Sequence, residues 1–172
     1  YNFFIDKVSH LLIQLGININ TTPVLDLRHK RSSNVIGDRS FSRDPKIVSS
    51  IGNMCIKKFQ ENSIGTIIKH IPGHGLAKVD SHFFTPTINK TLNYLKKNDF
   101  SAFKLKNSLF AMTAHVIFSK IDSINTVTHS KKMIKIIRDE IKFKNLIISD
   151  DLSMKSLKYT TEQNTLKSFK AG

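Results

Sequence analysis

The stretch IGTIIKHIPGHGLAKVDSH, residues 64 to 82, decides the fold and places the candidate site. Its first part, Ile64 to Ile68, is apolar and rich in β-branched residues, and turn residues bound it, so we predict a buried strand there. Lysine, histidine, proline and glycine follow at once, and glycine permits a tight turn of the backbone. A strand that runs into a polar loop is how α/β proteins commonly build active sites.

Helix and strand patterns alternate along the rest of the chain. Strands that alternate with helices of this length imply a parallel sheet with right-handed crossovers, but the pattern alone does not separate an open sheet from a barrel. The expected elements are a helix over 2–15 closed by Gly16, a strand from residue 17 that runs into an extended segment ending at 27, a loop over 28–44, a helix capped by Ser42 or Asp44 that runs through Phe59, the strand 64–68, a turn over 85–87, one or two helices over 92–109 interrupted near Asn98, a strand over 110–116, a helix over 130–141 capped by Ser130, a strand over 146–148 and a helix over 160–170. Pro23 argues against a regular ladder throughout 17–27.

Polar residues follow several of the predicted strands. The carboxyl ends of parallel strands meet on one face, so these residues are expected to converge there. Convergence from four strands is hard to explain by solvation alone and predicts an active site. The residues are Arg39 on the loop 28–44, Lys69 and His70 after the second strand, Asp80 and His82 on the loop that follows, His115 near the end of the third strand, and Asp150 and Asp151 after the fourth.

Other polar residues near these motifs have simpler interpretations. For Asp26, pairing with Arg28, with Arg31 or with backbone is favoured over catalysis. His74 is interpreted as a residue that folds its loop, and Ser81 as a spacer. Asp151 stays open between a residue that supports the site and a helix N-cap, and Met154 is assigned to the core.

Composition narrows the class of protein. The 172 residues suffice for one domain with a real core, and the net charge is +14. The lysines are scattered without interleaved aromatic residues, so nucleic acid is not the expected partner. No apolar run approaches the ~18 residues of a membrane helix. The single cysteine, Cys55, suits a reducing compartment, and we expect a cytoplasmic protein.

Three motifs carry a resemblance to a known family. KHIPGHG at 69–75, followed by DSH at 80–82, resembles the signature of the bacterial β-N-acetylglucosaminidases of glycoside hydrolase family 3. VIGDRSFSRDP at 35–45 and LIISDDLSM at 146–154 also match, in the expected order. The resemblance covers nearly the whole chain and implies a (β/α)8 TIM barrel, of which about four βα units are present. We therefore expect residues 1–172 to be a fragment of one catalytic domain, truncated at both ends and lacking the remainder of its own barrel.

The resemblance also implies roles for six residues. The first aspartate of SDDLSM, Asp150, matches the nucleophile, and the histidine of DSH, His82, matches the acid/base that Asp80 orients. An ordinary histidine pKa of ~6.5 suits a group that gives and takes a proton near neutrality. The residues that match hydrogen-bonding partners of the sugar hydroxyls are Arg39, Lys69 and His70. No cofactor is implied.

The expected function is that of a retaining exo-β-N-acetylglucosaminidase. By resemblance, the substrate is a muropeptide in which N-acetylglucosamine is β-1,4-linked to an anhydro-N-acetylmuramic acid unit, met during peptidoglycan recycling. A deprotonated histidine carries no negative charge that repels phosphate, so phosphorolysis beside hydrolysis stays open. The isolated 172-residue chain is expected to be inactive, because further sugar contacts would come from absent strands.

Two alternatives come from other classes. One is a metal-dependent hydrolase, because five residues are legitimate ligand types for zinc or manganese: His70, His74, Asp80, His82 and Asp150. Their spacing argues against it, because a glycine-rich turn separates the histidines. The other alternative is a truncated sugar-binding fragment without catalysis. The presence of Asp80, His82 and Asp150 together speaks against decay of the site.

Overall fold

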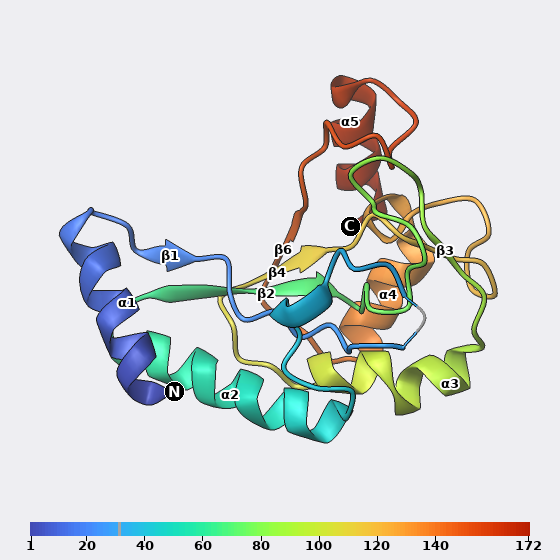
Figure 1. Cartoon of the computed structure of the whole chain (residues 1–172). Coiled ribbons are helices and arrows are strands. Elements are labelled where there is room, and N and C mark those ends of the chain that lie inside the picture. The colour runs from blue at the N-terminus through green and yellow to red at the C-terminus, as the bar shows by residue number, and fades with distance from the viewer. Residues whose placement is uncertain (31) are drawn as a thin grey trace.

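The computed structural model describes residues 1–30 and 32–172 (Figure 1). Helices and strands alternate along most of the chain. Their bounds are α1 (Asn2–Gln14), β1 (Ile19–Asn20), α2 (Pro45–Glu61), β2 (Gly65–Ile71), β3 (Thr87–Ile88), α3 (Leu92–Lys97), β4 (Phe110–Thr113), β5 (Ile117–Phe118), α4 (Lys131–Asp139), β6 (Leu146–Ser149) and α5 (Thr161–Ala171), with 3-10 turns at Gly37–Arg39, Asp99–Phe103 and Val127–His129.

The main sheet is parallel and has the strand order β1-β2-β4-β6. The connections between successive strands contain α2, α3 and α4 in turn. The predicted parallel sheet with intervening helices is therefore confirmed. All four strands point the same way, so the loops that leave their carboxyl ends lie along one edge of the sheet.

β2 is the strand predicted at the start of the 64–82 stretch, and it lies between β1 and β4. Ile68 and Ile71 are completely buried. A strand inside a parallel sheet is covered on both faces, which explains why its apolar residues are consecutive and do not alternate with polar ones. A second, smaller cluster joins α1 to α2 through Ile5, Cys55 and Phe59.

The helix starts follow the predicted capping residues. The carboxylate of Asp44 accepts a hydrogen bond of 2.8 Å from the backbone N–H of Lys46, with Pro45 in the first turn of α2. Ser130 caps α4 by accepting from the N–H of Met133. Of the two candidates for the α2 cap, Asp44 is therefore the one used, as expected for a short side chain with an acceptor oxygen.

The strand expected from residue 17 forms as the short β1 and gives way to the expected extended segment, in which an isolated bridge joins Val24 to Lys69. Pro23 lies between β1 and this bridge and, as expected, interrupts the ladder because it has no amide hydrogen to donate. The strand expected over 110–116 is too long, because it ends at Thr113.

The turn predicted over 85–87 is wrong. Thr87 begins β3, which pairs in parallel with β5 as a separate two-stranded sheet. A pair of two-residue strands leaves no periodic pattern in the sequence that could have predicted it.

Helix α1 forms where predicted, and its apolar residues are only partly covered. Ile5 and Ser9 are buried and Val8 and Leu12 pack against the cluster of Ile5, whereas Phe3 and Leu15 are each 74 % exposed. The helix packs mainly against α2, which covers only one narrow side of it. Among the described residues, no helix is both long and apolar enough to cross a membrane.

Candidate active site

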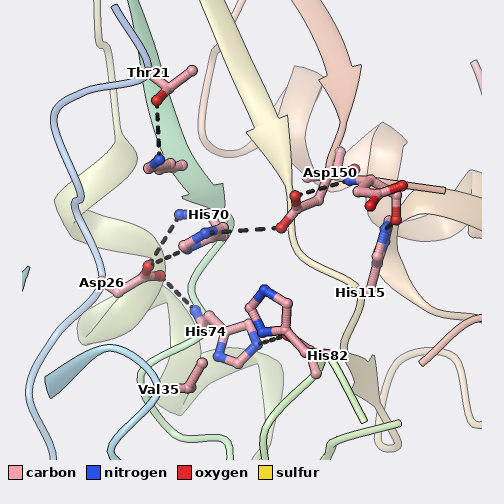
Figure 2. Close-up of polar contacts among 12 residues, drawn as sticks. Thr21, Asp26, Val35, His70, His74, His82, His115 and Asp150 are labelled. Carbon is pink, nitrogen blue, oxygen red and sulfur yellow. Dashed lines mark hydrogen bonds and ion pairs between the residues drawn. The ribbon is translucent and has the colours of Figure 1, made fainter. Parts of the chain in front are cut away.

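A cavity of about 200 Å³ lies at the carboxyl ends of the main-sheet strands. Five of the six residues predicted to form the site line it, and Asp80, the sixth, is bonded to one of them. Figure 2 shows His70, His82 and Asp150 around this space. The lining residues are Thr21, Val35, Ile36, Arg39, Lys69, His70, His74, Ser81, His82, Met112 and Asp150.

Asp80 and His82 form a pair on the loop after β2. The carboxylate Oδ1 of Asp80 lies 2.7 Å from Nδ1 of His82 and also accepts from the backbone N–H of His82 at 2.9 Å. Partial desolvation would raise the pKa of Asp80, but these bonds to His82 and its charge lower the pKa below its usual value. The carboxylate therefore stays ionised and orients the imidazole, whose side chain is 59 % exposed.

Asp150 follows β6 directly and faces β2. One carboxylate oxygen, Oδ1, accepts from the backbone N–H of Asp151 at 2.8 Å. The other, Oδ2, lies 3.9 Å from Nε2 of His70 and is partly exposed to the cavity. The parallel pairing of β4 with β6 places Asp150 there, because Thr113 at the end of β4 is paired with Ser149.

Asp26 is the buried centre of the site, and its partners were only partly predicted. Its Oδ2 accepts from the N–H of His70 at 3.1 Å and lies 2.7 Å from Nδ1 of the same ring, while Oδ1 accepts from the N–H of His74 at 2.6 Å. Burial would raise the pKa of Asp26, but the charge and hydrogen bond of His70 lower it below the usual value. The expected backbone pairing is correct. Arg28 forms no ion pair with Asp26, and Arg31 lies outside the described residues.

His74 and Ser81 meet in the interior. Nε2 of His74 lies 2.9 Å from the hydroxyl of Ser81, and both side chains are almost completely buried. Burial lowers the pKa of His74 to about 4, so its ring is neutral at pH 7. The loop-folding interpretation of His74 is confirmed. The interpretation of Ser81 as a spacer is wrong, because its side chain is bonded and buried.

Lys69 and Arg39, the two cations predicted to bind the sugar, both line the cavity. Lys69 donates to the hydroxyl of Thr21 at 3.3 Å, and Arg39 donates to the carbonyl of Val35. Burial lowers the pKa of the Lys69 ammonium, and the nearby charge of Arg39 lowers it further. Both residues line the cavity with His70, which gives a ligand three hydrogen-bonding side chains.

His115 supports the site without facing the cavity. Its Nδ1 lies 2.7 Å from the hydroxyl of Thr128, and its Nε2 donates to the backbone carbonyl of Asp151 at 3.0 Å. The ring is 1 % exposed, and burial lowers its pKa. The sequence placed His115 on the correct face of the sheet, but its contact is with the backbone beside Asp150 and not with the cavity.

Asp151, which the sequence left open between a residue that supports the site and a helix N-cap, and Met154, which it assigned to the core, both have local contacts. The carboxylate of Asp151 accepts from the N–H of Ser153 at 2.8 Å and from its hydroxyl. Asp151 therefore caps a turn, since residues 151–156 form no helix. Met154 is buried, as expected.

The geometry gives no support to the metal alternative. Within residues 1–30 and 32–172, no group of three or more His, Cys, Asp or Glu side chains is arranged to hold a metal ion. His70 and His74 instead share Asp26, and His82 is paired with Asp80.

Comparison with known proteins shows which family this fold resembles. Residues 6–172 match the glycosyl hydrolase family 3 N terminal domain. A beta-hexosaminidase of Pseudomonas aeruginosa is 36% identical over 142 residues, covering 81% of this chain and 42% of that protein. A beta-hexosaminidase of Idiomarina loihiensis is 36% identical over 162 residues, covering 92% of this chain and 48% of that protein.

Solved structures agree with this placement. NagZ from Neisseria gonorrhoeae, in complex with N-trifluoroacetyl-D-glucosamine, superposes with a TM-score of 0.85 at 33% identity, covering 95% of this chain and 48% of that one. A family 3 β-N-acetylglucosaminidase from Paenibacillus sp. str. FPU-7 superposes with a TM-score of 0.91 at 26% identity, covering 100% of this chain and 35% of that one.

The chain spans about 40 to 48% of the length of the curated relatives it matches. Its sheet of β1, β2, β4 and β6 is accordingly part of a (β/α)8 TIM barrel, as the resemblance implied. KHIPGHG and LIISDDLSM lie at the ends of β2 and β6, where such barrels hold their active sites, and VIGDRSFSRDP lies on the connection between β1 and α2. The chain belongs to the family of glycosyl hydrolase family 3 N-terminal domains.

Proposed function

We propose that this chain is the site-bearing part of a retaining exo-β-N-acetylglucosaminidase. The observation that carries the proposal is that Asp150 and His82 line one cavity, with Asp80 bonded to His82. Membership of the family and the beta-hexosaminidase relatives support the same reaction class. A retaining glycosidase needs a nucleophile and a group that first donates and then accepts a proton.

Asp150 is the proposed nucleophile. Its ionised carboxylate attacks the anomeric carbon, the bond from that carbon to the leaving oxygen breaks, and a glycosyl ester forms. The N–H of Asp151 holds one carboxylate oxygen, so the other, Oδ2, is directed to the cavity. In the second step a water oxygen replaces the carboxylate on the same carbon, which restores the free enzyme with retained configuration.

His82 is the proposed acid/base. As imidazolium it gives its proton to the leaving oxygen, and as neutral imidazole it later takes a proton from the attacking water. Nδ1 is held by Asp80, which leaves Nε2 for these transfers. Asp80 stays ionised because His82 lowers its pKa, so it stabilises the imidazolium without taking the proton itself.

Arg39, Lys69 and His70 are the proposed sugar-binding residues. All three line the cavity beside Asp150. Charged donors form short, oriented hydrogen bonds with hydroxyl groups, and such bonds position the anomeric carbon relative to the nucleophile. An exo-acting enzyme has to form such hydrogen bonds with the terminal sugar only.

The nucleophile assignment is tested with Asp150→Ala in the protein at its full natural length. Turnover of an aryl N-acetylglucosaminide should fall by several orders of magnitude, roughly 5–8 kcal/mol of barrier. The matched control is Asp151→Asn, whose carboxylate only caps a turn, and it should retain most activity. A slow fluorinated substrate should label the peptide that contains Asp150. Label on Asp80 would contradict the assignment.

The acid/base assignment is tested by varying the leaving group. His82→Ala should impair substrates with poor leaving groups far more than activated aryl glycosides, because only the former need a proton. The same assay run with and without phosphate decides between water and phosphate as acceptor. Sugar 1-phosphate among the products would indicate phosphorolysis, and its absence at high phosphate would exclude it.

The finer proposal is that the natural substrate is a muropeptide of peptidoglycan recycling, cleaved in the cytoplasm. It rests on the motifs that resemble those of the bacterial enzymes and on the cavity of about 200 Å³ that the predicted sugar-binding residues line. Incubation with N-acetylglucosaminyl-anhydro-muropeptides should release free N-acetylglucosamine. A protein that cleaves aryl glycosides but not these compounds would contradict this substrate and leave the reaction class intact. Activity that is lost in chelator would instead favour a metal-dependent hydrolase.

A further inference from the structure

Ser81 has an unusual environment for a residue of a surface loop. Its neighbours Asp80 and His82 have side chains 36% and 59% exposed, whereas Ser81 is only 4% exposed. Its hydroxyl points inward and lies 2.9 Å from Nε2 of His74. The loop that carries the acid/base is therefore anchored to the interior at the residue between the two members of the pair.

The anchor continues into a buried chain of hydrogen bonds (Figure 2). The backbone N–H of His74 donates to Oδ1 of Asp26, and Oδ2 of Asp26 lies 2.7 Å from Nδ1 of His70. Nε2 of His70 then faces Oδ2 of Asp150 at 3.9 Å. One carboxylate, Asp26, thus connects the loop of His82 with the imidazole next to the nucleophile.

Two further hydrogen bonds hold this loop at and beyond His82, and neither reaches the turn after β2. The carbonyl of His82 accepts from the N–H of Lys155 at 3.3 Å, and the hydroxyl of Thr85 donates to the carbonyl of Ser156 at 2.7 Å. Both join the loop to the segment after Asp150, which is itself built of turns. Among the described residues, the one side-chain hydrogen bond between this loop and the turn after β2 is the bond between Ser81 and His74.

We propose that Ser81 is a positioning residue: its hydrogen bond to buried His74 holds the loop so that the His82 imidazole reaches the leaving-group oxygen. This inference rests on the proposed function. Proton transfer requires the donor within about 2.6–3.2 Å of its target, and a displacement of ~1 Å can cost ~100-fold in rate. Ser81 itself touches no reacting atom.

The kinetic test compares Ser81→Ala with Ser156→Ala in the protein at its full natural length. Ser156 is a matched control, since its hydroxyl is equally buried and has no hydrogen-bond partner among the described residues. For a poor leaving group, Ser81→Ala should lower kcat about 100-fold. For an activated aryl glycoside the loss should be less than about 5-fold, because that substrate needs no proton. KM should change little, and Ser156→Ala should resemble the wild type.

An equal loss of kcat on both substrate classes would overturn the proposal, because it would indicate general disruption and not a misplaced acid. A second measurement does not depend on turnover. The N–H groups of Phe83 and Phe84 both point to the carbonyl of Asp80, and their hydrogen exchange reports the order of the loop. Ser81→Ala should speed their exchange at least about tenfold, and Ser156→Ala should not.

The two measurements separate failure of this inference from failure of the proposed function. If the wild type cleaves no N-acetylglucosaminide, the proposed function fails, and the exchange rates still decide whether Ser81 orders the loop. Unchanged exchange in Ser81→Ala overturns the inference whether or not the protein is an active glycosidase.

Discussion

Asp26 decides more of this site than any residue that lines the cavity. It is completely buried, and its two oxygens accept hydrogen bonds from the N–H of His70, near the end of β2, and from the N–H of His74 in the turn that follows. A buried carboxylate is tolerated only when such partners satisfy it. Its role is therefore to fix the backbone of His70 and His74, and with it the direction of both rings.

Asp26→Asn should destabilise the protein by about 3 kcal/mol, because the amide has one acceptor oxygen and two donors where the native site offers only donors. Urea unfolding at pH 7 measures the change. Asp38→Asn is the matched control, since Asp38 is exposed and makes no side-chain hydrogen bond among those described, and it should stay within about 0.5 kcal/mol. Equal stabilities of the two variants would contradict the role assigned to Asp26.

His74 makes stability depend on pH. Its pKa is about 4 when folded and 6.5 when exposed, so the unfolded chain binds the proton more readily. The contribution of His74 is complete above pH 6.5 and is lost as the pH falls toward 4, by about 3 kcal/mol in total. Unfolding free energies at several pH values should fall more steeply in this window for the wild type than for His74→Asn. Parallel curves would show that His74 is not buried in its neutral form.

The sequence predicts the candidate site residues at the ends of strands, and it misses the contacts that hold them. Asp150 directly follows β6 as predicted, whereas Lys69 and His70 lie in the last residues of β2, which extends to Ile71, beyond the predicted end at Ile68. In both cases the end of the strand fixes where the side chain points. Ser81 could not, because its contact depends on the path of a loop that returns to His74. The pairing of Asp26 with His70 joins residues 44 positions apart and leaves no local pattern.

At the scale of elements, the turn after β2 depends on close backbone approach. A Cβ at Gly75 would overlap the backbone carbonyl oxygen of Leu27 and lie 3.0 Å from its carbonyl carbon. This contact brings the chain after Asp26 against the turn that carries His74. The glycine is needed there for space between two backbone segments, and not for a left-handed conformation.

Gly75→Ala should therefore destabilise the protein by about 2 kcal/mol or more, because neither backbone segment can move without breaking the bonds to Asp26. Gly65→Ala in β2 is the matched control. Its Cβ would meet a flexible side chain, that of Leu109, at 3.0 Å, so the loss should be smaller. Thermal unfolding of both variants measures this difference, and a larger loss for Gly65→Ala would contradict it.

The elements that the sequence predicts well are those that carry their own boundary signals. α2 begins at the Asp44–Pro45 cap, and β2 is a consecutive apolar run. β3 and β5 were missed because each pairs over two residues only, and that pairing depends on tertiary structure. The exposure of Phe3 and Leu15 on α1 could not be predicted for a related reason: periodicity shows which residues of a helix are apolar, but not whether another element covers them.

At the scale of the whole molecule, the main sheet has two open edges. β1 and β6 each pair on one side only within the described residues. Next to β6, a largely apolar cavity of about 540 Å³ opens between the strand and α5, and Leu146 and Phe169 beside it are 63 % and 82 % exposed. Closed barrels have no such edges, and exposed edges with apolar surface favour association.

We expect residues 1–172, expressed alone, to self-associate despite the net charge of +14 and to show no measurable glycosidase activity. Light scattering and an aryl-glycoside assay test both expectations. The double variant Leu146→Lys with Phe169→Glu should reduce association, whereas Phe3→Lys on α1, far from this edge in the chain, should not. A monodisperse, active monomer would indicate that the open edges need no partner.

The strand order also has a consequence for how the polypeptide is made. The main-sheet strands lie side by side in the order in which they are synthesised, β1, β2, β4 and β6. Each strand that leaves the ribosome therefore finds its neighbour already present, and none has to be inserted between two earlier ones. The sheet can therefore form during translation, beginning at the amino terminus. Each new strand pairs with the edge strand that was synthesised before it.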